Sequence, residues 1–65
     1  MPLPNEIKQA RTKSGLTQSQ AAALVEYSMR AWQDWEAGKR KMRKSVFNRF
    51  ITLTQGDKNG KNHLL

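Results

Sequence analysis

The chain has 65 residues and a strongly basic composition, with twelve Lys and Arg against five Asp and Glu and a formal net charge of +7 at pH 7. A domain this basic is expected to bind a polyanion, most often nucleic acid. Cysteine is absent, which excludes disulfides, thiolate metal sites and cysteine nucleophiles. No apolar stretch has the length of a signal peptide or a membrane span, so we expect one small domain in the cytoplasm.

Helix signals follow one another closely from the start of the chain, and strand-like alternation is nearly absent. The first helix is predicted to begin near Pro4 or Asn5, because proline suits a first helical position and asparagine is a good N-cap. Gly15 is predicted to end it. The second helix is predicted to begin at the capping box T-Q-S-Q, which starts with Thr17, and to end near Val25.

The third helix is predicted over residues 28–37, with a serine as its N-cap and Gly38 as its terminator. Five cations then occupy the six positions 39–44. Apolar residues at helical spacing predict a fourth helix over about residues 45–55. The remaining residues, 56–65, form a polar tail that we expect to be mobile.

The fold class predicted from these signals is all-α. Four helices, or five elements at most, are expected over residues 1–55. The second and third helices are joined by a short turn over about residues 17–37, which is the arrangement of a helix-turn-helix DNA-binding motif.

The stretch GLTQSQAAALVEYSMRAWQDWEAGKRK, residues 15–41, resembles the Cro/C1-type, or Xre-like, helix-turn-helix repressors. The specific matches are Leu-Thr-Gln at 16–18, Ala22, and Trp35-Glu36-x-Gly38, within a similarity that covers about residues 7–53. The pattern S-x-R-x-W-Q-x-W-E-x-G is also similar to small phage and plasmid regulators, including anti-CRISPR-associated autorepressors. The resemblance implies a lambda-repressor-like fold.

The resemblance also implies a partly buried ion pair between Arg11 in the first helix and Glu36 at the end of the third. The alternative is that these are two unrelated surface charges. The sequence departs from the family at Glu26, where the turn usually has glycine. A non-glycine residue there predicts a strained or differently shaped turn, at a cost of about 1–2 kcal/mol.

Trp32 and Trp35 lie three residues apart, so they share one helix face. They are interpreted either as core residues, with the indole of Trp32 replacing volume that Ala21 leaves empty, or as a surface that stacks on nucleic-acid bases. The helical spacing and the lack of a predicted strand platform favour the core.

If the tryptophans point inward, the opposite face of the third helix is predicted to read base edges in the major groove. Arg30 matches guanine, Gln33 matches adenine, and Met29 can contact a thymine methyl group. An acidic residue on this face can accept from cytosine or pair with Arg30, and the second role is favoured. The alternative is an ordinary solvated surface. The predicted base-reading residues are Ser28, Met29, Arg30, Gln33 and Asp34.

Phosphate contacts are predicted from two other places. One is the amino end of the second helix, where backbone N–H groups and the helix dipole favour an anion. The other is the basic run that follows the third helix. The predicted phosphate-binding residues are Gln18, Lys39, Arg40, Lys41, Arg43 and Lys44.

One recognition helix reads only a few base pairs, so we expect a homodimer on half-sites about one helical turn apart. The fourth helix and the tail are the predicted dimer surface, and the alternative is that the fourth helix is simply core. The residues of this predicted surface are Phe47, Phe50, Ile51, Leu53, Leu64 and Leu65.

The expected function is that of a sequence-specific repressor, autoregulatory and of the phage or mobile-element type, which reads a palindromic double-stranded DNA operator through Ser28–Ala37. The alternative is a small antitoxin-like adaptor that binds a protein partner. An enzyme is not expected, because the lone His63 lies in the predicted tail and no catalytic cluster is evident. We expect no cofactor, no metal, no small-molecule substrate and no membrane, and a cytoplasmic location associated with the nucleoid.

Overall fold

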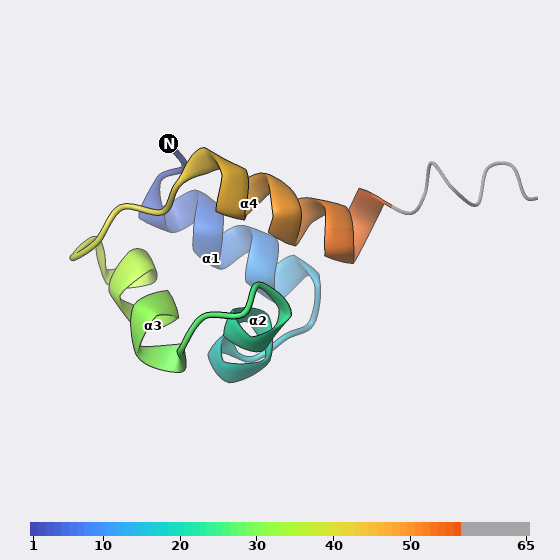
Figure 1. Cartoon of the computed structure of the whole chain (residues 1–65), viewed down its shortest axis with the longest axis horizontal. Helices are drawn as coiled ribbons and strands as arrows, with labels where there is room; N and C mark the ends of the chain where they lie inside the picture. Colours follow the sequence, from blue (N-terminus) through green and yellow to red (C-terminus); the bar gives the residue numbers. More distant parts are fainter. Residues whose placement is uncertain (57–65) are drawn as a thin grey trace, which may run out of the picture.

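The computed structural model describes residues 1–56, and this part of the chain consists of four α-helices and a short π-helical segment, with no strand (Figure 1). This confirms the predicted all-α, four-helix class. None of the helices within residues 1–56 combines the length and the hydrophobicity needed to cross a membrane. The elements are α1 Pro4–Lys13, α2 Gln18–Leu24, α3 Met29–Ala37, α4 Lys44–Ile51 and the π-helical η1 Thr52–Gly56.

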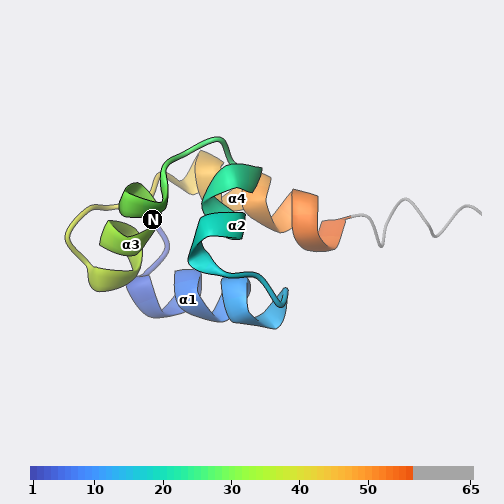
Figure 2. The same ribbon diagram turned by 90° about the horizontal axis from the view of Figure 1, so that it is seen from below.

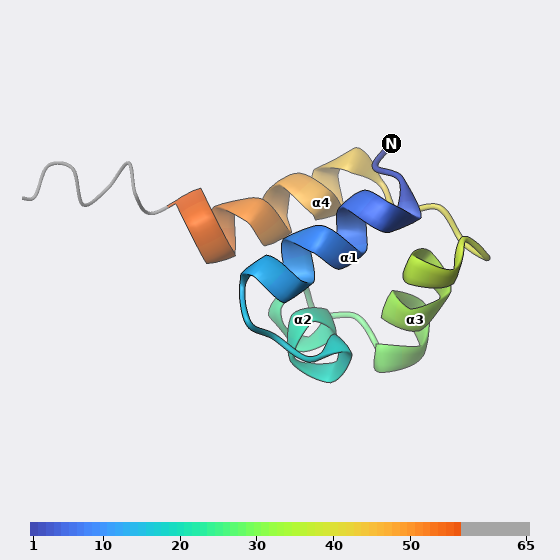
Figure 3. The ribbon, with the colours of Figure 1, turned by 180° about the vertical axis from the view of Figure 1, so that it is seen from behind.

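The helices form two layers. Helices α1 and α4 run in roughly the same direction on opposite sides of the domain, and α2 and α3 lie across one side of both (Figures 1 and 2). The view from behind shows α1 in front of α4, with α3 below their amino-terminal halves (Figure 3). Helix α3 packs against both α1 and α2, so its inner face is covered by the other helices.

The predicted helix starts at residues 17 and 28 are confirmed by hydrogen bonds. The hydroxyl of Thr17 accepts from the N–H of Gln20 at 3.0 Å, and the Gln20 side chain accepts from the N–H of Thr17 at 2.9 Å. The hydroxyl of Ser28 accepts from the N–H of Ala31 at 3.1 Å. Each side chain satisfies a backbone donor that the helix itself cannot pair.

The start of α1 differs in detail from the prediction. Pro4 is its first residue, and Leu3 occupies the N-cap position rather than Asn5. A leucine side chain cannot accept a hydrogen bond, so Glu6 satisfies this end from inside the helix, and its carboxylate accepts from the N–H of Leu3 at 2.9 Å.

Helices α1, α2 and α3 end in the same way, with a residue in the left-handed conformation. These residues are Gly15 at φ 75°, Glu26 at φ 64° and Gly38 at φ 79°. After each of them, the next N–H bonds to the carbonyl five residues back, which is the Schellman arrangement. The expectation of a strained turn at Glu26 is therefore confirmed, because only this one of the three carries a Cβ atom.

The core is built around the two indoles. The side chain of Trp32 is fully buried and that of Trp35 is 4% exposed, so their predicted place in the core is confirmed. The Trp32 ring centroid lies 5.5 Å from that of Trp35 and 5.0 Å from that of Phe50. Ala21 is also fully buried, in keeping with the predicted exchange of volume between α2 and α3.

Met42 fixes the loop between α3 and α4. It stands alone among five cations, yet its side chain is fully buried in the core. Arg43 then takes the N-cap position, and α4 begins at Lys44, close to the predicted start. Burial of one thioether therefore holds a loop whose other side chains are charged and exposed.

The strain at Glu26 predicts that Glu26→Gly is more stable than Glu26→Ala by about 0.5–1 kcal/mol. Both substitutions remove the carboxylate, but only alanine keeps the Cβ atom that disfavours a positive φ, at a cost of about 1–2 kcal/mol. Part of this difference is offset by the greater freedom of glycine in the unfolded chain. Urea unfolding followed by tryptophan fluorescence measures the two free energies, and equal stabilities would contradict strain at this position.

Candidate nucleic-acid interface

The carboxylate of Glu36 ties the inner side of α3 to the rest of the domain. Arg11 donates to it twice, from Nε at 2.6 Å and from Nη2 at 3.2 Å. Gln18 Nε2 donates at 3.0 Å and the indole Nε1 of Trp32 donates at 2.6 Å. Arg11 also donates from Nη1 to the carbonyl of Leu16 at 3.0 Å. The two carboxylate oxygens thus accept four hydrogen bonds, which fills their capacity.

The ion pair implied by the family resemblance is therefore present, and it is largely withdrawn from water. The side chain of Arg11 is 14% exposed and that of Glu36 is 7% exposed. Burial by itself raises the pKa of Glu36, but hydrogen bonds from Arg11, Trp32 and Gln18, with the guanidinium charge, outweigh it and hold the pKa below its ordinary value. The carboxylate is ionised at neutral pH and anchors three helices.

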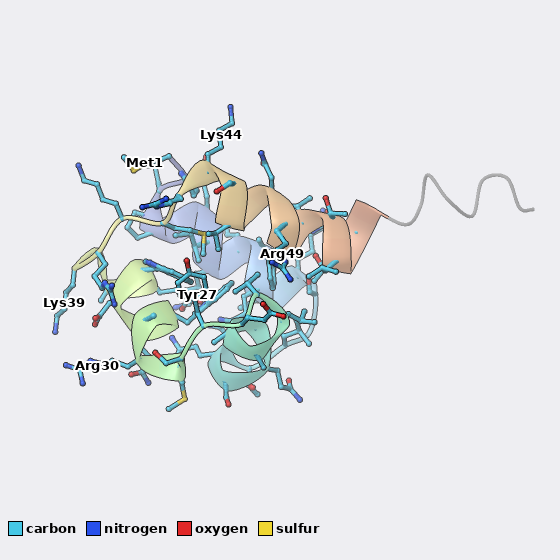
Figure 4. The ribbon with its side chains drawn as sticks, viewed as in Figure 1. Met1, Tyr27, Arg30, Lys39, Lys44 and Arg49 are labelled. Carbon is cyan, nitrogen blue, oxygen red and sulfur yellow. The ribbon has the colours of Figure 1, made fainter. Side chains whose placement is uncertain are left out.

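With its inner face fixed, α3 presents its predicted reading face to solvent. The side chain of Arg30 is 80% exposed, and it projects away from the body of the domain (Figure 4). Met29 and Gln33 are exposed on the same face. Ser28 is exposed as well. Because its hydroxyl oxygen accepts the capping hydrogen bond, the hydroxyl proton is the main group left to contact DNA.

Asp34 takes the role that the sequence favoured. Its carboxylate lies 3.7 Å from Nε of Arg30, one helical turn earlier, and the aspartate side chain is 18% exposed. An exposed pair of this kind is worth about 0.2–1 kcal/mol. The pair is strong enough to bias the direction of the guanidinium. It is also weak enough for the guanidinium to leave the carboxylate and bind a base instead.

The basic run divides into two groups. Lys39, Arg40 and Lys41 lie exposed in the loop after α3, and Lys39 projects to the same side of the molecule as Arg30 (Figure 4). Lys44 instead projects at the top of the view (Figure 4), where it lines a shallow hollow together with Met1. The sequence treated these cations as one patch, but the loop turns around the buried Met42 and sends them in different directions.

The side chain of Gln18 makes a different contact from the predicted one. Its side-chain amide is bound to Glu36, so this side chain serves the ion pair. The backbone N–H groups of Gln18 and Ser19 precede the first intrahelical bond of α2, which runs from the N–H of Ala21 to Thr17. These N–H groups remain the feature of this helix end that suits a phosphate oxygen.

Comparison with known proteins agrees with this geometry. The helix-turn-helix domain family matches residues 4–64. The chain belongs to this family.

This helix-turn-helix domain is also similar to part of the type II methyltransferase M.MspI of a Moraxella species, with 40% identity over 45 residues. The similarity covers 69% of this chain but 11% of the methyltransferase. The chain thus spans about a tenth of that protein.

One predicted dimer residue of the helix-turn-helix domain is corrected by the structure. Phe50 is fully buried against Trp32, so it has no side-chain surface to give a partner. Phe47 and Ile51 are half-buried and pack against the core, whereas Leu53 is 51% exposed. The other predicted members of the dimer surface, Leu64 and Leu65, lie outside the described residues, as does His63.

Sequence reasoning missed two contributors to this site. It placed Trp32 in the core without assigning a hydrogen-bond acceptor to its indole N–H. A buried indole N–H normally needs an acceptor, and that rule points to a nearby carboxylate. It also assigned no role to Met42, although one apolar residue within a run of cations is itself a signal of burial.

The lowered pKa of Glu36 predicts a stability difference that depends on pH. Because this pKa is lower in the folded than in the unfolded chain, the carboxylate contributes fully above the unfolded-state value of about 4.3. Its contribution is lost as the pH falls through the folded-state pKa. Glu36→Gln strands the Arg11 charge and is expected to be less stable than the wild type by about 3 kcal/mol at pH 7.

Urea unfolding of both proteins from pH 7 to pH 2 measures this difference, in a fixed concentration of sucrose that keeps the variant folded. We expect the difference to stay constant near neutral pH and to shrink below about pH 4. A difference that stayed the same down to pH 2 would show that this carboxyl has an ordinary pKa in the folded protein.

Proposed function

We propose that the chain is a sequence-specific repressor that binds double-stranded DNA as a homodimer and reads a palindromic operator through the helix Ser28–Ala37. Its action is occupancy of the operator, without catalysis, in the cytoplasm where the DNA lies. The autoregulatory role and the phage or mobile-element setting rest on the resemblance of the segment S-x-R-x-W-Q-x-W-E-x-G to small regulators of that kind.

One observation carries the proposal: α3 turns both indoles inward and leaves Arg30 and Gln33 exposed on its outer face. Trp32 and Trp35 are buried, so the aromatic rings are not available for stacking on single-stranded bases. The exposed guanidinium and amide are the side chains that match guanine and adenine in the major groove. In a helix-turn-helix domain the second helix of the motif is the one that enters that groove.

The cations support the same placement. Lys39 projects to the same side as Arg30 (Figure 4), so a duplex against α3 brings phosphates within reach of the loop. Arg40 and Lys41 follow it in that loop and are exposed. Phosphate contacts of this kind fix the position of the helix, while base contacts set the sequence.

The methyltransferase relative does not change this proposal. The chain spans a tenth of that protein, so methyl transfer is not carried over from the relative's name. DNA binding is supported instead by the match of this chain to the helix-turn-helix domain family.

The test is a selection from random-sequence duplex DNA, carried out in parallel with the wild type, Arg30→Ala and Lys39→Ala. The wild type is expected to select an inverted repeat. Arg30→Ala is expected to lose preference at one base pair of each half-site, a loss of about 1–3 kcal/mol of discrimination. Lys39→Ala is expected to keep the preferred sequence but to bind all sequences more weakly, with the slope of log affinity against log salt lowered by about 1.

The two variants control for each other, because each removes one exposed cation from the same side of the domain. If Arg30→Ala selects the same sequence as the wild type with equal stringency, the assignment of the reading face is wrong. If the wild type selects no sequence at all, the proposed sequence-specific function is wrong.

A further inference from the structure

A second surface of the domain carries three partly exposed apolar side chains outside the reading face, one of which, Tyr27, also packs edge-on against the core residue Trp35, with ring centroids 5.0 Å apart. Leu24 is 36% exposed, Tyr27 is 44% exposed and Leu53 is 51% exposed. They belong to the end of α2, the α2–α3 turn and η1. We call this surface, together with Glu26 and Arg49, the turn–α4 surface.

Two segments that are distant in the sequence, the α2–α3 turn and α4, meet at this surface. Nη2 of Arg49 is 3.7 Å from Oε2 of Glu26, so the ion pair joins the turn to α4. Tyr27 adjoins Glu26 in the chain, and Leu53 follows Arg49 by four residues. The α2–α3 turn lies on the same side of the molecule as α4, opposite α1 (Figure 2), and Tyr27 and Arg49 are both seen on that side in Figure 4.

The turn–α4 surface differs in charge from the rest of the domain. Three other acidic side chains within residues 1–56 are committed elsewhere: Glu6 accepts from a backbone N–H, Asp34 pairs with Arg30, and Glu36 is buried in its network. Glu26 is 76% exposed. In a chain of net charge +7, two copies repel one another over most of their surface, but here each offers both a carboxylate and a guanidinium.

The backbone at Glu26 gives a second reason to assign a role to this carboxylate. Glycine would relieve the left-handed conformation at φ 64°, as it does at the ends of α1 and α3. Its intramolecular partner is 53% exposed, and an ion pair this exposed to water adds little to the stability of the fold. A strained position that keeps a charged side chain points to a function for the charge.

We propose that the turn–α4 surface is where a second copy of this chain docks about a two-fold axis, with Glu26 of each protomer facing Arg49 of the other. A two-fold interface must be complementary to itself, and a surface that carries one acidic group, one basic group and exposed apolar side chains can meet this condition. The inference rests on the proposed function in that it supplies the dimer that a palindromic operator requires. Arg30 and Lys39 project in a different direction (Figure 4), so the reading face stays free for DNA.

The test uses two charge-reversal variants. Their dimerisation is measured by sedimentation velocity, without DNA, over a range of protein concentrations. Glu26→Arg leaves two cations on each copy of the surface and Arg49→Glu leaves two anions. Each variant alone is expected to dimerise at least about tenfold more weakly than the wild type. An equimolar mixture of the two is expected to recover dimerisation, because both cations of one variant then face carboxylates of the other.

This mixing separates an intermolecular pair from an intramolecular one. If the pair only joined the turn to α4 within one chain, mixing two variants would restore nothing. Circular dichroism controls for folding, and Leu53→Asp provides a second disruption that leaves the ion pair intact and is expected to give a monomer.

The proposal is overturned if the wild type is monomeric at all concentrations, if the single variants dimerise like the wild type, or if the mixture stays monomeric. Because no DNA is present, none of these results bears on the reading face. Failure of the DNA selection, in turn, would not contradict the proposed dimer surface.

Discussion

One buried carboxylate holds the parts of this domain in their working arrangement. Glu36, near the end of α3, accepts hydrogen bonds from Arg11 of α1, Gln18 of α2 and Trp32 of α3 itself. A carboxylate with this little contact with water is stable only when every lone pair has a donor, and here all four have one. Because the donors come from three helices, satisfying the charge requires the three helices to meet in one geometry.

This geometry decides what α3 offers to a partner. The bond from Trp32 to Glu36 and the contacts of both indoles with the core fix the rotation of α3 about its axis. If α3 were turned by one residue so that Gln33 took the place of Trp32, a polar amide would enter the core. A single core of this size rarely supplies more than about 3–5 kcal/mol, so a charge left unpaired in this network is a large loss on the scale of the whole fold.

The sequence predicted the helices well because their ends are set by local chemistry. Thr17, Ser28 and Gly38 act on groups within a few residues of themselves, and such signals can be read without knowing the fold. The burial of Phe50 and the separation of Lys39 from Lys44 could not be read in that way. Each of these depends on which helix packs against which face, and that information is held in contacts between distant residues.

The most direct measurement is a titration of the ¹⁵N-labelled protein with its selected DNA duplex, followed by NMR through the backbone amides and the two indole N–H groups. We predict that the amide signals of Met29, Arg30 and Gln33 shift most, while the Trp32 indole N–H signal hardly moves and keeps its slow exchange with solvent. Large shifts of the indole signals, with Arg30 and Gln33 unchanged, would contradict the view that α3 reads DNA with its outer face while Glu36 holds its inner one.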